Sequence, residues 1–187
     1  MAMCKCGGLT ERKRLNSYVV PGTLLGVQNV TLVDAVFEEK CAKCGNGKIA
    51  IPDIPGLITA VALTRVKLPF KLNHHEIKFV RKAMDLSAKE LAHHLKVAPE
   101  TLSRWENEKL PMTEQSEVFF RLIAIALLSG GAQAVDPEMD KVVKMDIQAV
   151  YDQQELANWM HFVRVFRDRK DTEADELWKD NRKVANG

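Results

Sequence analysis

Two helix-start signals and a helix-initiating proline follow one another between residues 71 and 110, and they constrain the fold more than any other stretch. Each signal places a glutamate three positions after a capping residue, so that each side chain can satisfy the other's backbone N–H group. The two pairs are Asn73 with Glu76 and Ser87 with Glu90. Pro99 follows a short turn and stands where a third helix would begin, a position that does not need its missing N–H. Two helices, a tight turn and a third helix predict a helix-turn-helix.

The predicted third helix, which starts at Pro99, has two unlike faces. Leu102 and Trp105 are three positions apart, so they share one side and are expected to pack in the core. The other side carries groups that can hydrogen-bond to base edges, namely Glu100, Thr101, Ser103, Arg104 and Asn107. A recognition helix needs this division because its outer face enters the major groove of double-stranded DNA. Arg104 is the leading candidate for a base contact, since its guanidinium group fits O6 and N7 of guanine.

Two lysines complete the predicted DNA-binding residues. Lys89 lies near the start of the second predicted helix and Lys96 lies in the turn, where phosphate contacts are usual. A solvated surface position is the alternative for each lysine. Four histidines occur as adjacent pairs, His74 with His75 and His93 with His94. Adjacent helix residues point apart, so we interpret these histidines as surface residues and not as metal ligands.

The runs at residues 86–92 (LSAKELA) and 102–106 (LSRWE) resemble the Xre/Cro-type helix-turn-helix. This resemblance implies a five-helix DNA-binding domain. It also implies that the side chain of Trp105 packs in the core and that Glu106 has a structural role.

The four cysteines form two close pairs separated by a long segment, and each pair is followed by glycine. The pairs are Cys4 with Cys6 and Cys41 with Cys44. Four thiolates on two tight turns can satisfy tetrahedral Zn²⁺ with no open position, which predicts a structural zinc site and not a catalytic one. Two disulfides or a dithiol redox pair are the alternative. A reducing cytosol, expected because no secretion signal stands out, disfavours that alternative.

The predicted fold class is α+β, with a small zinc-stabilised N-terminal β module joined to an all-α helix-turn-helix domain. β-Branched residues predict strands at residues 17–20 and 30–39, and a packing helix is expected at residues 55–67. The predicted division of the chain has four parts: a zinc module (1–50), a helical connector (51–71), a helix-turn-helix DNA-binding and dimerisation domain (72–131), and a C-terminal extension (132–187).

The composition sets wide limits on the function. The chain has 187 residues, of which 46% are hydrophobic, and we expect them to form two small cores. A formal net charge of +2 neither demands nor excludes nucleic acid, so a DNA-binding field must come from local placement of charges. The longest apolar run, at residues 118–128, is interrupted by Arg121 and is too short to cross a membrane. We therefore expect a cytoplasmic protein without a membrane partner.

A long helix is expected to start at Thr113 or Ser116 and to end at the glycines 130 and 131. Its wide apolar surface consists of Val118, Phe119, Leu122, Ile123, Ala126 and Leu127. We interpret this surface equally as domain core or as the interface of a homodimer. A dimer is expected because two half-sites one helical turn apart give useful specificity.

The C-terminal extension gives weaker signals than the rest of the chain. Alternating apolar residues at 143–151 predict a strand, and residues 162–166 are its predicted antiparallel partner in a β-hairpin. Residues 156–166 also fit a helix that buries one side. From residue 167 onward the charges alternate, which predicts a solvated helix or a frayed tail.

The order of these features resembles the MqsA-like antitoxins, which have a YgiT-type zinc finger and an Xre-type helix-turn-helix, over about residues 1–130. The resemblance implies that the four cysteines hold zinc, that the N-terminal module binds a small RNase toxin, and that the other domain dimerises on a palindromic operator. It also implies that Arg104 reads a base. The family's base-reading asparagine is replaced here by Glu100, for which a different base contact or none is expected. Glu100 can accept a hydrogen bond from cytosine N4 or simply repel phosphate.

Three functions are consistent with these residues. We expect a zinc-stabilised, dimeric, sequence-specific DNA-binding repressor that regulates its own operon and is not an enzyme. The first alternative is an antitoxin that also neutralises a small RNase toxin. The second is a dithiol redox protein that uses Cys41 and Cys44.

Overall fold

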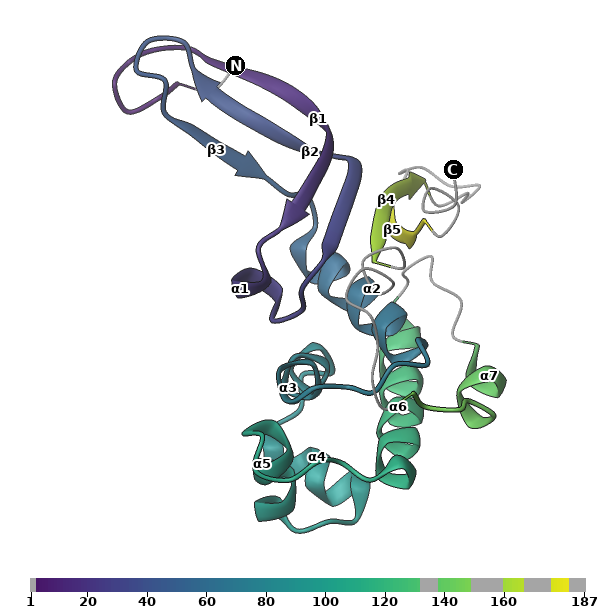
Figure 1. The fold of residues 1–187 in the computed structure, drawn as a ribbon. Helices are drawn as coiled ribbons and strands as arrows, with labels where there is room; N and C mark the ends of the chain where they lie inside the picture. The colour runs from purple at the N-terminus through teal and green to yellow at the C-terminus, as the bar shows by residue number, and fades with distance from the viewer. Residues whose placement is uncertain (1–2, 132–137, 149–159, 167–175, 182–187) are drawn as a thin grey trace.

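The computed structural model describes residues 3–131, 138–148, 160–166 and 176–181, and Figure 1 shows its elements. The first elements are β1 (Thr10–Val20), α1 (Gly22–Leu25), β2 (Val30–Cys41), β3 (Gly47–Ala50) and α2 (Ile54–Val66). The next are α3 (His74–Ala83), α4 (Ala88–Leu95), α5 (Pro99–Glu106) and α6 (Glu114–Leu128). The last are the 3₁₀ helix η1 (Ser129–Gly131), α7 (Met139–Val143), β4 (His161–Phe166) and β5 (Glu176–Asp180). An N-terminal sheet followed by a helical region confirms the predicted α+β class.

The three short helices start where the sequence predicted. Asn73 Oδ1 accepts a hydrogen bond from the Glu76 backbone N–H at 3.0 Å, and Glu76 Oε2 accepts from the Asn73 N–H at 2.9 Å. Ser87 and Glu90 make the same pair of bonds at 3.2 and 2.8 Å. Pro99 is the first residue of α5. Both capping boxes and the proline start are therefore confirmed.

The N-terminal strands form an arm, defined here as β1, β2 and β3, which projects from the helical part of the molecule (Figure 1). β1 and β2 pair antiparallel along their length, and β3 pairs with the last residues of β2. Both long strands extend beyond the predicted 17–20 and 30–39. β1 is exposed at most positions, so its sequence carries little of the apolar alternation that marks a half-buried strand.

The C-terminal residues complete the same sheet and do not form a separate hairpin. β4 pairs in parallel with β2 and antiparallel with β5. The prediction of a strand at residues 162–166 is confirmed, but its predicted partner is wrong. Residues 139–143 form α7, which packs on α6 through the buried Val142, and Gln148 makes only an isolated bridge to Phe70. Residues 149–151 of the predicted partner lie outside the described residues.

The charged end of the chain contains a strand with a buried tryptophan, where a solvated helix or frayed tail was predicted. The Trp178 side chain on β5 is fully buried, and its indole N–H donates to the carbonyl oxygen of Asp53 at 3.0 Å. Arg164 on β4 donates to the Asp53 carboxylate at 3.1 Å and lies over the Trp178 ring. A single large apolar residue is a weak signal among charges, and only the tertiary contact shows its role. The rest of the predicted tail lies outside the described residues.

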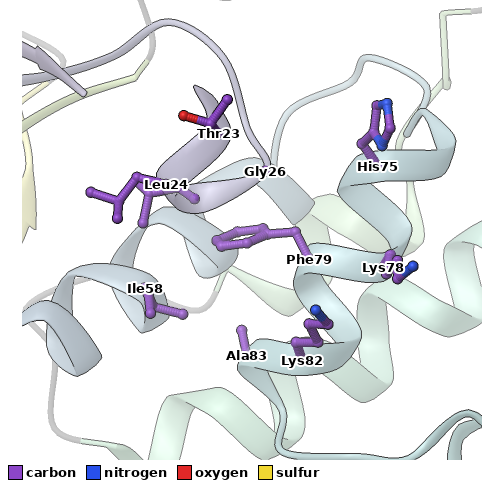
Figure 2. A pocket seen from close by; sticks show the side chains of 10 residues that line it. Thr23, Leu24, Gly26, Ile58, His75, Lys78, Phe79, Lys82 and Ala83 are labelled. Carbon is purple, nitrogen blue, oxygen red and sulfur yellow. The ribbon is translucent and has the colours of Figure 1, made fainter. Parts of the chain in front are cut away.

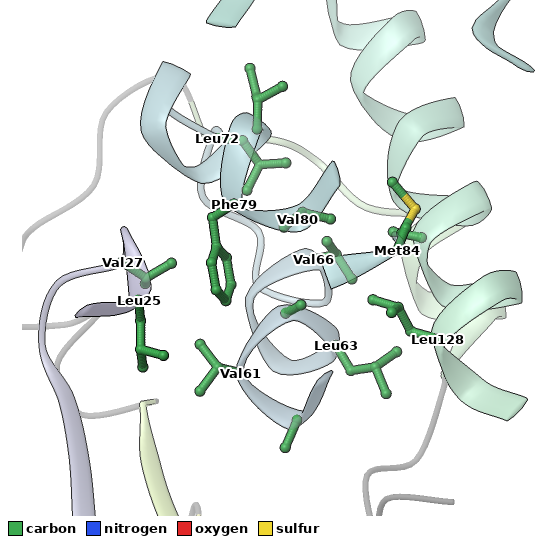
Figure 3. Close-up of a cluster of buried hydrophobic side chains, with 14 of the residues drawn as sticks. Leu25, Val27, Val61, Leu63, Val66, Leu72, Phe79, Val80, Met84 and Leu128 are labelled. Atoms are coloured by element: carbon green, nitrogen blue, oxygen red, sulfur yellow. The ribbon is translucent and has the colours of Figure 1, made fainter. Parts of the chain in front are cut away.

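Helix α2 is the centre of the molecule. From Leu57 onward it is buried on nearly all sides, because β5 contacts it as well as the helices α3 and α6. The buried apolar side chains of the described residues form one continuous cluster, where two small cores were predicted. Figure 3 shows part of this cluster, in which Leu25, Val61 and Leu128 come from α1, α2 and α6.

The start of α6 is confirmed, and the structure separates the two interpretations of its apolar surface. Thr113 caps the helix, whose buried side chains are Glu117, Phe120, Arg121, Ala124, Ile125 and Leu128. Phe119 and Leu127, which belong to the predicted apolar surface, are 45% and 49% exposed. The core interpretation therefore fails for these two residues. No described helix, α6 included, is long and apolar enough to cross a membrane.

Candidate zinc centre and nucleic-acid interface

The four cysteines meet at the far end of the arm. The first pair precedes β1 and the second pair closes and follows β2, and the antiparallel register sets Thr10 opposite Cys41. All four Sγ atoms lie within 4.8 Å of one another. The Cys4 and Cys44 sulfurs are 3.7 Å apart, and those of Cys6 and Cys41 are 3.5 Å apart. The predicted ligand set is thus brought together in full.

These sulfur distances fit a shared metal ion and not a disulfide. Four sulfurs at about 2.3 Å from a tetrahedral Zn²⁺ are about 3.8 Å from one another, whereas a disulfide bond is about 2.05 Å long. All four cysteines are free thiols. Four soft ligands leave no open coordination position, so the cluster is suited to hold a metal for structural purposes.

Three glycines let the two turns approach each other. Gly7 and Gly45 have φ of +77° and +72°, and their N–H groups donate to the carbonyl oxygens of Cys4 and Cys41 at 2.9 and 3.0 Å. A left-handed backbone at these turns favours glycine because other residues are strained there. A Cβ on Gly8 would lie 2.8 Å from Cys41 Sγ. No larger residue fits between the turns at that position.

The electrostatics of the cluster favour a thiolate at Cys41. The backbone N–H of Cys44 donates to the Cys41 sulfur, and with the Lys43 N–H it lowers the pKa of Cys41 to about 6 although the residue is buried. The Gly8 N–H lowers the pKa of Cys6, but the neighbouring thiols of Cys44 and Cys41 and burial outweigh it and raise this pKa to about 12. The thiolate is the form of cysteine that binds metal ions, so a lowered pKa at Cys41 favours metal binding by the cluster.

The outer face of α5 exposes most of the predicted DNA-binding side chains. Glu100, Ser103, Arg104 and Asn107 are exposed, as are Lys89 and Lys96, and Thr101 is half-buried. The Asn107 side chain donates to the Ser103 carbonyl oxygen at 2.7 Å, so it caps the end of the helix. Among the described residues nothing binds the Arg104 guanidinium group. Arg104 is thus free to reach a ligand, whereas Asn107 is already engaged.

The inner face fixes α5 to the helices before it. Leu102 is fully buried and Trp105 nearly so, which confirms that Trp105 packs in the core. Glu106 accepts two hydrogen bonds from the Arg81 guanidinium group, at 2.6 and 3.0 Å, and Arg81 also donates to the Leu86 carbonyl oxygen. This bidentate pair links α5 to α3 and to the turn before α4. It gives Glu106 the structural role that the resemblance implied.

Two buried ion pairs that hold the helix-turn-helix against α2 were missed by the sequence analysis. Arg65 on α2 donates to both carboxylate oxygens of Glu76 on α3, at 2.6 and 2.8 Å. Arg121 and Glu117 form the second pair within α6. The available signal was Arg121 itself, because a charged residue in the longest apolar run is rare unless it is paired.

Residues 77–115 match the family model described as Helix-turn-helix. The match runs from the first turn of α3 through α4 and α5 to the start of α6. This region, with the exposed polar face of α5, supports a DNA-binding regulator. The comparisons with curated proteins and with solved structures found no match.

Proposed function

We propose that this protein is a zinc-stabilised, homodimeric transcription repressor that binds a palindromic operator and regulates its own operon. The observation that carries the proposal is the outer face of α5, which exposes polar side chains while the inner face is fixed by Leu102, Trp105 and Glu106. A recognition helix requires both properties, because it must be rigid and must offer hydrogen-bonding groups.

The proposed base contacts follow from the chemistry of each exposed side chain. Arg104 donates two hydrogen bonds to O6 and N7 of a guanine, and Glu100 accepts from N4 of a cytosine. Ser103 and Thr101 have hydroxyl groups that can donate or accept. Asn107 keeps its bond to Ser103 and contributes by fixing the end of the helix.

The proposed phosphate contacts come from Lys89 in the first turn of α4 and Lys96 at its end. Lys96 has φ of +56°, which turns the chain between α4 and α5. Phosphate contacts of this kind carry no sequence information but fix the register of α5 in the groove. Binding should therefore weaken as salt rises, since each contact releases counterions.

Helix α6 is the proposed dimer interface. Phe119 and Leu127 are both about half exposed on the helix face that does not pack in the core. An exposed apolar face on a helix behind the recognition helix suits a symmetric contact with a second copy, in which the same face is used by both subunits. Two recognition helices would then read the two halves of a palindrome.

Zinc is the proposed ion of the cysteine cluster, held by Cys4, Cys6, Cys41 and Cys44. The arm has little apolar core of its own at that end. Among the described residues 3–15 and 37–50, only Gly8 and Cys41 are buried. Metal binding would therefore supply much of the free energy that folds the end of the arm. We assign no catalytic role to these thiolates.

The experiment that tests this proposal is a DNA-binding titration with the region upstream of the protein's own gene. Arg104→Ala should weaken binding by about 1–3 kcal/mol and relax specificity at one base pair. Lys13→Ala, which removes one exposed charge on the arm, is the control and should change binding little. Equal affinity of the Arg104 variant and the parent would show that α5 does not read bases.

An antitoxin is the second candidate function, and the shape of the molecule favours it. The arm projects away from the helices that include α5, so a small RNase toxin bound there would leave the recognition helix free (Figure 1). Purification from the native host tests this candidate. A stoichiometric small protein encoded beside this gene would support it, and a protein that comes away alone with its metal would contradict it.

A further inference from the structure

A groove separate from the cysteine cluster and from α5 lies where α1, α2 and α3 meet (Figure 2). Its volume is about 320 Å³. Pockets that bind small molecules usually measure about 300–1,000 Å³, so this groove is large enough for a small ligand. One wall is α1, which connects strands β1 and β2 of the arm, and the other belongs to the helix-turn-helix through α3.

The floor of the groove is apolar. Phe79 extends from α3 toward α1 (Figure 2), and Leu25 and Ile58 also line the groove. The backbone of Gly26, with φ of +72°, turns closely against Phe79, because a Cβ there would be 3.6 Å from that of Phe79. Leu24 stands at the edge of the groove and is 54% exposed. An apolar part of a ligand that covers these side chains would bind favourably, because both apolar surfaces are removed from water.

The α3 wall carries two positive charges, those of Lys78 and Lys82. His75, Lys78 and Lys82 line the groove from α3, and none of the described residues that line it is acidic. Lys78 and Lys82 are four positions apart, and such like-charged neighbours destabilise a helix by about 0.2–0.5 kcal/mol. Within the described part of the chain neither lysine forms an ion pair, whereas Arg81 on the same helix pairs with Glu106. An anion placed over the two lysines would relieve their repulsion.

We propose that this groove binds a small amphiphilic anion, with an apolar body on Phe79 and Leu24 and a carboxylate or phosphate group over Lys78 and Lys82. The charge of the wall and the apolar floor together select this chemical class over neutral or cationic ligands. Because one wall is α1, which connects the arm's strands β1 and β2, and the other belongs to the helix-turn-helix, the bound anion contacts both α1 and α3. Its effect on operator binding rests on the proposed function, but its binding does not.

The test is calorimetric titration of the full-length, zinc-loaded protein with octanoate, in the absence of DNA. Octanoate should bind saturably at one site, and 1-octanol, which has the same chain and no charge, should bind more weakly. The double variant K78Q/K82Q should lower octanoate affinity roughly tenfold, since each partly exposed charge contact contributes up to about 1 kcal/mol. Leu24→Ser should weaken octanoate and 1-octanol alike.

The matched control is K13Q/K40Q, which removes two exposed lysines from the arm and should leave octanoate affinity unchanged. Equal octanoate affinity of the parent and K78Q/K82Q, or no saturable binding at all, would overturn the inference. Loss of operator affinity in K78Q/K82Q without any octanoate binding would also overturn it and would assign the lysines to DNA phosphates. If octanoate binds as expected while no upstream DNA is bound, the proposed function fails and this inference stands.

Discussion

Arg121 and Glu117 form an ion pair one turn apart on α6, with 2.7 Å between Arg121 Nη2 and Glu117 Oε1 and both side chains fully buried. Arg121 also donates to the carbonyl oxygens of Val66, Leu68 and Phe70. Burial lowers the pKa of Arg121, and the adjacent Glu117 carboxylate opposes this effect. The pair thus satisfies the backbone that leads from α2 to α3, and it fixes the helix-turn-helix against the central helix.

Arg121→Met should lower the free energy of unfolding by about 3–5 kcal/mol, because it leaves the Glu117 carboxylate buried without its partner. The three carbonyl oxygens would also lose their donor. Urea unfolding followed by circular dichroism measures this loss. Arg121→Met combined with Glu117→Leu should recover part of it, since no isolated charge remains. A single variant as stable as the parent would show that the pair contributes nothing to the fold.

This pair also explains why the sequence did not identify the face of α6 that packs in the core. Charged residues on a helix are normally expected to face solvent, so Glu117 and Arg121 were expected on the exposed side. The apolar surface was therefore drawn on the side that carries Phe119 and Leu127. The two charges are inside because the connector's carbonyl groups need a donor there. The sequence predicted the helix starts at Asn73 and Ser87 correctly, because each cap depends only on residues within three positions of it.

The exposed face of α6 leads to a prediction about the oligomeric state. Phe119→Glu with Leu127→Glu should convert a dimer into a monomer, because two like charges would face each other across a symmetric contact. Both residues are about half exposed, so stability should change little. Sedimentation equilibrium measures the mass, and Gln115→Glu, an exposed change on the same helix, is the control. A parent protein that is already monomeric would contradict the α6 interface.

The zinc centre gives a prediction that does not alter any ligand. A Cβ on Gly8 would be 2.6 Å from Lys43 Cβ and 2.8 Å from Cys41 Sγ, so Gly8→Ala should push the two turns apart. We expect zinc affinity to fall roughly tenfold or more, as for other changes to the surroundings of metal ligands. Competition with a chromogenic chelator measures the affinity. Gly130→Ala, whose Cβ would meet nothing within 4 Å, is the matched control.

The sequence predicted the members of the cysteine cluster because their spacing and type are local properties of the chain. It predicted strands in this module but not their full length or their register. β1 and β2 bring the two pairs together through a register that begins at Val20 and Val30 and ends at Thr10 and Cys41. Most of β1 is exposed on both faces, so the pairing depends on backbone hydrogen bonds with β2 that no residue pattern in β1 reveals.

The last prediction concerns β5, the strand that the alternating charges concealed. Trp178→Ala should lower the free energy of unfolding by about 3–5 kcal/mol, because it removes a fully buried indole from between the sheet and α2. The Asp53 carbonyl oxygen would also lose its donor, and Arg164 would lose the ring beneath it. Lys179→Ala, an exposed change on the same strand, should shift stability by no more than about 0.5 kcal/mol. Chemical unfolding curves of the two variants measure the difference between their free energies of unfolding. Equal stabilities would mean that the end of the chain contributes nothing to the core, whereas the expected difference would show that the sheet is incomplete without it.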